Sequence, residues 1–346
     1  MIPQALPTSR VPDPMDAPAL RWGIMGPGWI ADLFTQSLQA HTKQIVTAVG
    51  SRSLDRSQAF AARYGIPSAY GSYADLAAAG DVDIVYVATP HNFHHAAAVL
   101  ALSAGKHVLI EKPIAMNAAQ ARDIRDRAHT AGLFAAEALW SLFLPKFDVA
   151  RQIIESGTLG ELTTVIIEYG EHYDPSNRIF DPALAGGPLL DLGIYPLALT
   201  TTLLGRPSEV RAIGTDHATG VNGQISAIMA FAGGAQAIVN TQLHNFTPTT
   251  AVLVGKTATL TFDGMFNRPG GFTVAFPDGR KLRYDEPTGS IADGIHFQAV
   301  AAARLIHAGE RQAPERPLSE SITTLDLTDE IRRQLGITFP GEEPSR

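Results

Sequence analysis

Short apolar segments alternate with alanine-rich helical segments between Leu20 and about Trp140. The expected strands are "LRWGIM" (20–25), "QIVTAVG" (44–50), "DIVYVA" (83–88), "KHVLIEK" (106–112) and "LFAAEAL" (133–139). Strands that alternate with helices are typical of βαβ units and a parallel sheet. The pattern therefore predicts a doubly wound α/β domain over residues 19–141.

The ends of two intervening helices can be read from their capping residues. Asn92 is expected to cap a helix that Gly105 ends. Asn117, with Gln120 three positions later, resembles a capping box for a helix that Gly132 ends. Asparagine side chains accept hydrogen bonds from the first N–H groups, and glycine permits the left-handed conformation that ends many helices.

After about Pro145 the pattern changes to one helix followed by alternating strands. The helix is expected at 146–157, and the strands at 161–173, 223–234, 235–246 and 257–264. Gly-Gly and Asp-Gly between them favour hairpins, so we expect a large, mostly antiparallel open sheet. Two closing helices, 297–309 and 320–336, are expected to pack on one of the two domains, and the α+β domain is predicted over residues 142–346.

Composition limits the classes of partner. With 346 residues the chain is long enough for two domains, and its net charge of −7 with no basic cluster argues against nucleic acid. No apolar run reaches the ~20 residues that span a bilayer, so no membrane partner is expected. The chain has no cysteine, which excludes disulfides, thiolate metal sites and a cysteine nucleophile. A small-molecule partner is favoured.

The first 18 residues are rich in proline and lack the basic and apolar regions of a secretory signal. They are expected to form a disordered tail, and the protein is expected to be cytoplasmic.

A glycine motif, "GPGWIA", joins the first strand to the first helix. Gly26 permits a tight turn, Gly28 lets the backbone approach a pyrophosphate, and Ala31 allows close packing of helix on strand. The helix start, with Trp29 and Ile30, offers N–H groups to the phosphates. This motif predicts dinucleotide binding in a Rossmann fold. Alternatively, the glycines only form a tight turn between strand and helix, and no ligand binds there.

The second strand ends in "VGSRSLDRS", where an NAD-binding domain generally has an acidic residue for the ribose. Here Ser51 and Arg52 take that place, and Arg56 follows one turn later. A hydroxyl and two guanidinium groups favour a 2′-phosphate, so NADP is expected rather than NAD. Alternatively, Ser53 caps the next helix and both arginines are only solvated.

The third predicted strand is followed by "ATPHNFHH". Thr89, Pro90 and His91 come at the carboxyl end of a parallel strand, where ligands of open α/β sheets bind. His94 is a further candidate for the cofactor site, whereas His95 fits an ordinary surface position. The spacing of histidines and carboxylates does not indicate a metal site.

The fourth strand ends in "EKP", with Glu111 and Lys112 at the same edge. A lysine beside a nicotinamide can hold a substrate hydroxyl and lower the pKa of a neighbouring acid. A surface lysine without such a role is the alternative.

The remaining candidates for the catalytic site are expected on one helix over about 188–204, which begins with Pro188 and ends at Gly205. Asp191 and Tyr195 are four residues apart, so one helix would present both on one face. Oxidation of a carbinol requires the hydroxyl proton to move, and Tyr195 could carry it with Lys112 nearby. Alternatively, the negative charge of Asp191 only interacts favourably with the dipole at the start of the helix, and Tyr195 is a core residue.

Five motifs together resemble the glucose-fructose oxidoreductase / inositol dehydrogenase / MocA family. They are "GPGWIA", "ATPHNFHHAAAVLALSAGKHVLIEKPIAMN", "EALWSLFLP", "IFDPALAGGPLLDLGIYPL" and "DEIRRQLGITFP", in this order over Leu20–Pro340. The helix motif resembles the branch of dimeric dihydrodiol dehydrogenases and NADP-dependent xylose dehydrogenases, since inositol dehydrogenases typically have histidine at the position of Tyr195. Two positions depart from the family pattern, Ala185 in place of glycine and Pro188 in place of alanine. Pro188 fits the helix start, and the loop that faces the sugar is expected to be stiffer than in the family.

The resemblance implies that Lys112 and Tyr195 are the catalytic pair, that Asp191 with the regions of Trp140 and Phe180 borders the substrate, and that the second domain's sheet forms a homodimer or homotetramer. The residues expected to bind the cofactor are Gly26, Gly28, Trp29, Ile30, Ser51, Arg52, Arg56, Thr89, Pro90, His91, His94, Glu111 and Lys112. The expected function is an NADP-dependent oxidoreductase that acts on a sugar, cyclic polyol or dihydrodiol. A glycosidase that oxidises its sugar transiently and a non-catalytic NADP-binding regulator are the alternatives.

Overall fold

The structure, a computed structural model, describes residues 3–340 and divides into two compact units. The Rossmann unit comprises residues 12–143 and 290–321, and the sheet unit comprises residues up to 11, 144–289 and from 322 onward. These units differ from the continuous domains expected at 19–141 and 142–346, because the segment 290–321 belongs with the first half of the chain. Its helix, α9 (His296–His307), packs on α1 (Trp29–His41), where Nδ1 of His296 lies 2.9 Å from Oγ of Ser37.

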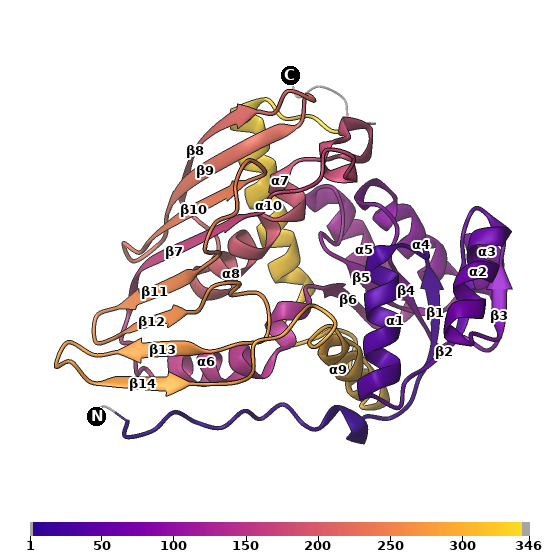
Figure 1. Ribbon diagram of the computed structural model, residues 1–346, viewed down its shortest axis with the longest axis horizontal. Helices are drawn as coiled ribbons and strands as arrows, with labels where there is room; N and C mark the ends of the chain where they lie inside the picture. The colour runs from indigo at the N-terminus through magenta and orange to yellow at the C-terminus, as the bar shows by residue number, and fades with distance from the viewer. Residues whose placement is uncertain (1–2, 341–346) are drawn as a thin grey trace. The chain divides into compact units, whose positions relative to one another are not determined.

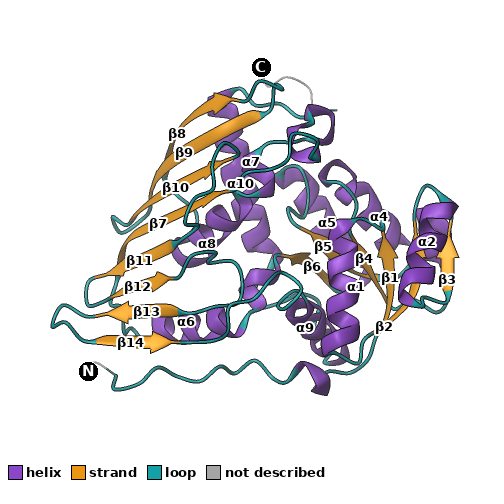
Figure 2. Ribbon diagram, in the orientation of Figure 1, coloured by secondary structure: helices purple, strands orange, loops and turns teal. Residues whose placement is uncertain are grey.

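The Rossmann unit is built on a six-stranded sheet in the order β3-β2-β1-β4-β5-β6, and every neighbouring pair is parallel (Figures 1 and 2). The strands are β1 (Arg21–Met25), β2 (Ile45–Gly50), β3 (Ser68–Tyr70), β4 (Ile84–Val87), β5 (His107–Glu111) and β6 (Ala135–Ala138). The predicted doubly wound parallel sheet is confirmed. From β1 the chain first adds β2 and β3 on one side of the sheet and then adds β4, β5 and β6 on the other side. The topological switch point therefore lies between β1 and β4, and open α/β sheets bind their ligands at the carboxyl ends of the strands at such a point.

The helices of this unit begin and end largely at the residues that cap them. Besides α1 and α9 they are α2 (Leu54–Tyr64), α3 (Tyr73–Ala78), α4 (His94–Ser103) and α5 (Ala118–Ala131). The side chain of Asn117 accepts the N–H of Gln120 and Gly132 is left-handed, as predicted. Asn92, however, does not cap α4: it lies in a short 3-10 helix, His91–Phe93, and α4 begins at His94.

The core of the Rossmann unit contains three packed aromatic rings, from β1, α1 and β4. The ring of Phe34 on α1 lies 3.9 Å from that of Tyr86 and 5.4 Å from that of Trp22, between centroids. The buried indole N–H of Trp22 donates to Oε1 of Gln44 at 3.0 Å. Aromatic pairs of this kind add about 0.5–1.5 kcal/mol each beyond the burial of their surface.

The sheet unit contains an eight-stranded sheet in the order β14-β13-β12-β11-β7-β10-β9-β8. The strands are β7 (Leu162–Gly170), β8 (Glu209–Asp216), β9 (Asn222–Ala230), β10 (Gln236–Gln242), β11 (Ala251–Gly255), β12 (Thr259–Phe262), β13 (Phe272–Ala275) and β14 (Lys281–Tyr284). Only β7 and β10 pair in parallel among its neighbouring strands in the described chain. The predicted large, mostly antiparallel sheet is therefore confirmed.

Helices cover one face of this sheet (Figure 2). They are α6 (Pro145–Glu155), α7 (Pro188–Asp191), α8 (Ile194–Leu204) and the part of α10 (Leu318–Leu335) that belongs to this unit. Phe147 of α6 stacks on Phe262 of β12 at 5.0 Å between ring centroids, and α7 and α8 contact β9, β7 and β10. The opposite face carries exposed isoleucines.

The helix predicted over 188–204 is broken into α7 and α8. The segments Pro182–Asp191 and Ile194–Leu204 are bent by 46°, and the N–H of Gly193 bonds back to the carbonyl of Pro188. Pro196 in the first turn of α8 has no N–H to donate to Leu192, which explains why the hydrogen-bond ladder starts anew here. The expectation that Asp191 and Tyr195 share one face of a continuous helix is therefore wrong.

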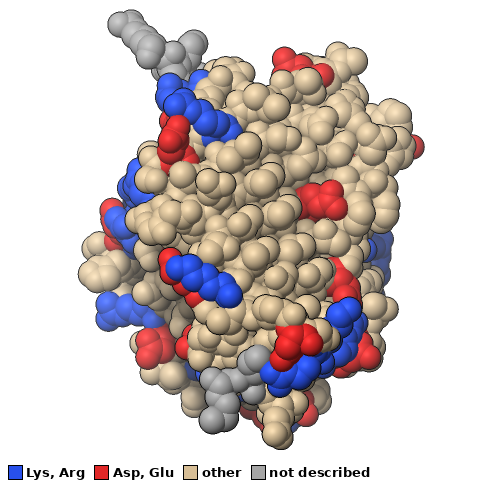
Figure 3. Space-filling view, turned by 90° about the vertical axis from the view of Figure 1, so that its left-hand side faces the viewer, with Lys and Arg blue, Asp and Glu red and all other residues tan. Residues whose placement is uncertain are grey.

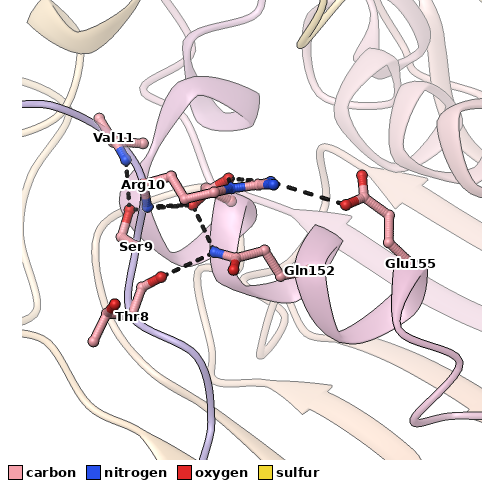
Figure 4. A network of polar contacts seen from close by, with 7 residues as sticks. Thr8, Ser9, Arg10, Val11, Gln152 and Glu155 are labelled. Carbon is pink, nitrogen blue, oxygen red and sulfur yellow. Dashed lines mark hydrogen bonds and ion pairs between the residues drawn. The ribbon is translucent and has the colours of Figure 1, made fainter.

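The described part of the N-terminal segment makes specific polar contacts, in contrast to the expected disordered tail. Nη2 of Arg10 lies 2.7 Å from Oδ1 of Asp148 on α6, and the backbone N–H of Arg10 donates to Oδ2 at 2.6 Å (Figure 4). Nε2 of Gln152 donates to the carbonyl of Thr8 at 2.9 Å. Although burial alone would raise it, hydrogen bonds from Arg10 leave the pKa of the Asp148 carboxyl below its usual value.

Within residues 3–340 no single helix is long and apolar enough to cross a membrane, and only the bent pair Pro182–Asp191 and Ile194–Leu204 would suffice when its two parts are taken together.

Candidate functional site

The glycine turn after β1 has the geometry that a pyrophosphate requires. Gly26 has φ +95°, and a Cβ at this position would lie 2.8 Å from the carbonyl oxygen of Ala88. A Cβ on Gly28 would meet no atom of residues 3–340 within 4 Å, so the described part of the chain leaves this space open. Gly28 is also the N-cap of α1 and has no side chain to accept the first N–H groups, and Trp29 beside it is 67% exposed. Turn and helix start therefore fit a dinucleotide phosphate.

The residues after β2 form a basic surface beside this turn. The guanidinium carbon of Arg52 lies 5.1 Å from the ring centroid of Phe93. Burial raises the pKa of the Tyr73 phenol, while the charges of Arg52 and Arg56 act in the opposite direction, so both arginines lie near one phenol. Ser51 is buried, and its Oγ accepts the N–H of Ser53 at 3.3 Å.

Two residues after β4, Thr89 and His94, differ in their hydrogen bonding. Oγ1 of Thr89 is buried and has no hydrogen-bond partner among the described residues, as expected of a group that a bound ligand satisfies. His94 is fully buried, with Nε2 2.7 Å from the carbonyl oxygen of Thr89 and Nδ1 2.7 Å from that of Pro113. Its ring faces the backbone of two strand ends.

At the end of β5, Glu111 is held by its neighbours and Lys112 begins the loop. The hydroxyl of Tyr86 donates to Oε1 of Glu111, and Oε2 accepts the N–H of Lys112 at 3.2 Å. Lys112 is half-buried, in contrast to buried Glu111. Trp140, after β6, is 1% exposed, in a 3-10 helix over Trp140–Phe143.

In the sheet unit, Asp191 lies in a polar group at the end of α7. Its Oδ2 pairs with Nη2 of Arg178 at 3.2 Å, in the 3-10 helix Arg178–Phe180. Burial raises the pKa of the Tyr173 phenol, and the carboxylates of Asp191 and Glu171 raise it further. Asp191 is thus surrounded by a cation and a neutral phenol, both of which can hold a hydroxyl-bearing ligand.

Tyr195, in the first turn of α8, is 6% exposed and lies beside a second buried tyrosine. The ring centroids of Tyr195 and Tyr169 are 5.7 Å apart, and the hydroxyl of Tyr169 donates to Oε1 of Glu171 at 3.0 Å. Burial raises the pKa of Tyr169, with Glu171 and Tyr195 adding to the effect. Lys112 belongs to the Rossmann unit and Tyr195 to the sheet unit, so their meeting over a cofactor stays a prediction.

The ring of Phe180, which was expected to border the substrate, packs against a histidine. Its ring lies 4.7 Å from that of His217, which in turn lies 5.9 Å from that of His244. Tyr169, Tyr173 and Arg178 were not singled out from the sequence, because they lie in a strand end and loop without a recognisable spacing. The "EYGEHY" run contained the only available signal, two tyrosines four residues apart at a strand end.

No group of three or more histidine, aspartate or glutamate side chains within residues 3–340 could hold a metal ion.

Two family models match the chain. The model described as an oxidoreductase family with an NAD-binding Rossmann fold matches residues 20–138, and the GFO/IDH/MocA C-terminal domain matches residues 147–261. Together they cover the glycine turn, all six strands of the parallel sheet and the first part of the sheet unit.

Curated relatives match over almost the full length. The chain is 35% identical over 342 residues to trans-1,2-dihydrobenzene-1,2-diol dehydrogenase of Bos taurus, with 94% of this chain and 99% of that protein covered. It is 34% identical over 336 residues to the Mus musculus protein of the same name, with the same coverage.

Solved structures share the fold. KijD10, a 3-ketoreductase from Actinomadura kijaniata in complex with TDP-benzene and NADP, is 26% identical, with a TM-score of 0.78 over 91% of this chain and 97% of that chain. Levoglucosan dehydrogenase in complex with NADH and levoglucosan has a TM-score of 0.84 over 93% and 100% of the chains, at 18% identity. The predicted dehydrogenase class is confirmed: this chain is a nicotinamide-dependent oxidoreductase and belongs to the GFO/IDH/MocA family.

Proposed function

We propose that this chain is an NADP-dependent dehydrogenase that oxidises or reduces a carbinol carbon of a cyclic dihydrodiol, sugar or polyol. One observation carries the proposal. The glycine turn, the orphaned Thr89 hydroxyl and Lys112 all follow strands whose carboxyl ends lie at one edge of the parallel sheet. The substrate class is taken from the names of the curated relatives, which are dehydrogenases of a cyclic dihydrodiol.

The choice of NADP over NAD rests on the basic surface after β2. Arg52 and Arg56 lie near the Tyr73 phenol, and no carboxylate occupies the first two positions after the strand. Guanidinium groups bind phosphate oxygens with paired, charge-assisted hydrogen bonds, whereas a ribose hydroxyl is generally recognised by a carboxylate. A 2′-phosphate is therefore the better match.

In the proposed reaction, the glycine turn, Thr89 and Arg52 would hold NADP at this edge, and its nicotinamide would supply the acceptor for the hydride of the carbinol carbon, or the hydride itself in the reverse direction as NADPH. Tyr195 takes the hydroxyl proton during oxidation and gives it back during reduction. Lys112, with its ammonium group, holds the substrate oxygen and favours the ionised phenol. Asp191, paired with Arg178, orients a second hydroxyl of the substrate.

We also propose that the chain forms a homodimer or homotetramer through the outer face of the large sheet. Ile166, Ile238 and Ile228 are paired in register across β7, β10 and β9, and their side chains are 43%, 42% and 56% exposed. Figure 3 shows this side as a broad surface with few acidic or basic side chains. A contiguous exposed apolar row is typical of a surface that another protein covers.

The proposal is tested by following nicotinamide absorbance with the purified chain, NADP or NAD, and a panel of trans-dihydrodiols, aldoses and cyclic polyols. We expect reduction of NADP with at least one diol or sugar and a higher kcat/KM with NADP than with NAD. Absence of turnover with every substrate in both directions contradicts the activity, and a preference for NAD contradicts only the cofactor assignment.

A further inference from the structure

Two buried polar side chains of the Rossmann unit bind the main chain directly after Lys112. Glu137, on β6, accepts the N–H of Ile114 through Oε1 at 3.0 Å. Nδ1 of His94 lies 2.7 Å from the carbonyl oxygen of Pro113. Both side chains belong to fully buried residues. The peptide that follows Lys112 and Pro113 is therefore held at its carbonyl and at its N–H by side chains of two other elements.

Glu137 is fixed in turn by a distant segment of the chain. Its Oε2 accepts hydrogen bonds from Nε of Arg316 at 2.9 Å and from Oγ of Ser321 at 2.7 Å. Arg316 is also fully buried. Replacing such a buried ion pair by apolar side chains of similar volume is often neutral or even stabilising, so stability gives no sufficient reason for it. Its evident effect is to fix the direction of the oxygen that faces Ile114.

His94 connects the same loop to the neighbouring strand. Nε2 of its ring lies 2.7 Å from the carbonyl oxygen of Thr89, the residue with the orphaned hydroxyl after β4. Carbonyl oxygens only accept, so the ring donates to both when both nitrogens carry a hydrogen and to one of them in the neutral form. In either form the imidazole lies as a bridge between the ends of β4 and β5, which are adjacent in the sheet. Thr89 and Lys112 both follow these ends, so the bridge fixes the spacing of two predicted cofactor contacts.

We infer that Glu137 and His94 are positioning residues for Lys112, with Arg316 and Ser321 orienting Glu137. The inference rests on the proposed function, in which the Lys112 ammonium assists proton transfer. Catalysis is sensitive to position, since a displacement of about 1 Å far from the chemistry can lower a rate by roughly 100-fold. A loop that leaves a strand end needs such anchors, because the strand's own hydrogen bonds stop at Glu111.

Two double variants separate this role from stability. In E137Q/R316M both charges are removed, and the amide oxygen of the new side chain can still accept the N–H of Ile114. In E137M/R316M the charges are removed in the same way, but the acceptor is lost and the side chain keeps a similar length. In E137Q/R316M, Ser321 can still orient the side chain after the loss of Arg316, so we expect kcat to fall by no more than about threefold, whereas kcat of E137M/R316M should fall by about tenfold or more because the acceptor itself is lost. KM for NADP is expected to change less than kcat in both, because the glycine turn and Thr89 also contact the cofactor in the proposed complex.

A second readout does not depend on turnover. Lys112 is labelled with a lysine-directed reagent such as trinitrobenzenesulfonate and quantified by peptide mass spectrometry relative to exposed Lys281. We expect the labelling rate of Lys112 to differ between the two double variants. If both variants fold and show equal kcat and equal labelling, the inference is wrong. A wild-type chain without dehydrogenase activity contradicts the proposed function, while the labelling still reports on the anchor.

His94→Leu tests the second anchor independently, including the case in which the double variants do not fold. It removes both contacts to the strand ends, so we expect lower kcat and altered labelling of Lys112. Partial recovery of both in His94→Gln, which keeps one amide donor, supports the positioning role. Wild-type kcat and labelling in folded His94→Leu contradict it.

Discussion

At the scale of residues, Gly26 and Gly28 are glycines for different reasons. Gly26 has a positive φ and lies close to the carbonyl of Ala88, so the folded protein requires it. Gly28 has a negative φ, and a Cβ there would meet no described atom within 4 Å, so the fold leaves room for a side chain and the proposed pyrophosphate is our reason for the glycine. We expect Gly26→Ala to lower the free energy of unfolding by about 1–3 kcal/mol, and Gly28→Ala to leave it nearly unchanged.

The matching expectation for binding is that Gly28→Ala raises the Kd for NADP(H) by at least about tenfold, since the methyl group fills the space that the pyrophosphate needs. Urea unfolding and NADPH fluorescence titration measure the two effects. Tight NADPH binding by Gly28→Ala is the result that disagrees with a phosphate at this turn.

Arg52 and Arg56 carry the cofactor preference. In Arg52→Ala and Arg56→Ala we expect the Kd for NADP to rise by roughly 10–100-fold, because a hydrogen bond to a charged group contributes about 1.5–3 kcal/mol. The Kd for NAD should change little, which makes NAD the internal control. If the Kd values for NADP and NAD rise equally, the arginines stabilise the fold or bind the pyrophosphate, and the assignment to the 2′-phosphate is wrong.

The positions of candidate residues at the strand ends were predictable where a motif fixes both residue type and place, while their roles remain proposals. The glycine turn and "EKP" follow strands whose ends the βαβ pattern already locates. The contacts of His94 with the protein's own backbone were not predictable, because its partners are the carbonyl oxygens after two different strands. Tyr173 and Arg178 were missed for a similar reason, since only folding places them near Asp191.

At the scale of elements, the parallel sheet was predictable and the break between α7 and α8 was not foreseen. Five apolar runs became β1, β2, β4, β5 and β6, whereas the three-residue β3 is too short to show a period. The apolar run 188–204 has helical spacing throughout, and Pro196 was the local signal for a new helix start. In the sheet unit, β13 and the edge strand β14 do alternate in exposure, but each has only four residues, too few for the alternation to mark a strand in the sequence.

The packing of α9 on α1 predicts a response to acid. Burial, together with the charge of His41, lowers the pKa of His296 to about 4, and Asp293 only partly opposes this. An unfolded histidine titrates near 6.5, so the unfolded chain binds a proton that the folded chain does not. This contribution to stability is complete above pH 6.5 and is lost as the pH falls toward 4.

We expect the free energy of unfolding of the wild type to lose about 2 kcal/mol more than that of His296→Gln between pH 7 and pH 4.5. Urea unfolding at the two pH values measures the difference. Identical pH dependence in both chains is incompatible with a buried neutral His296.

At the scale of the whole molecule, the division into units shows what local pattern cannot predict. The segment 290–321 folds with the Rossmann unit although residues 144–289 come between the two parts, since its buried groups pair with Ser37 and Glu137. The described N-terminal segment likewise has its partners, Asp148 and Gln152, far along the sequence.

The outer sheet face gives a prediction for assembly. Lysine at Ile228 or Ile238 places a charge in the apolar row that the proposed interface covers, so we expect the variant to sediment as a monomer at concentrations where the wild type is a dimer or tetramer. Ile45→Lys, on β2 of the Rossmann unit and 52% exposed, is the matched control and should assemble normally. A monomeric wild type contradicts the proposed interface.

The proposed role of Tyr195 as the proton acceptor, assisted by Lys112, is the central claim, and the turnover of Tyr195→Phe tests it most directly. With a substrate that the wild type oxidises, we expect kcat to fall by about 10²–10⁴-fold while the Kd for NADPH stays the same, because only the proton acceptor is lost. Lys112→Met should show a loss of similar kind. A folded Tyr195→Phe variant with the kcat of the wild type contradicts the account.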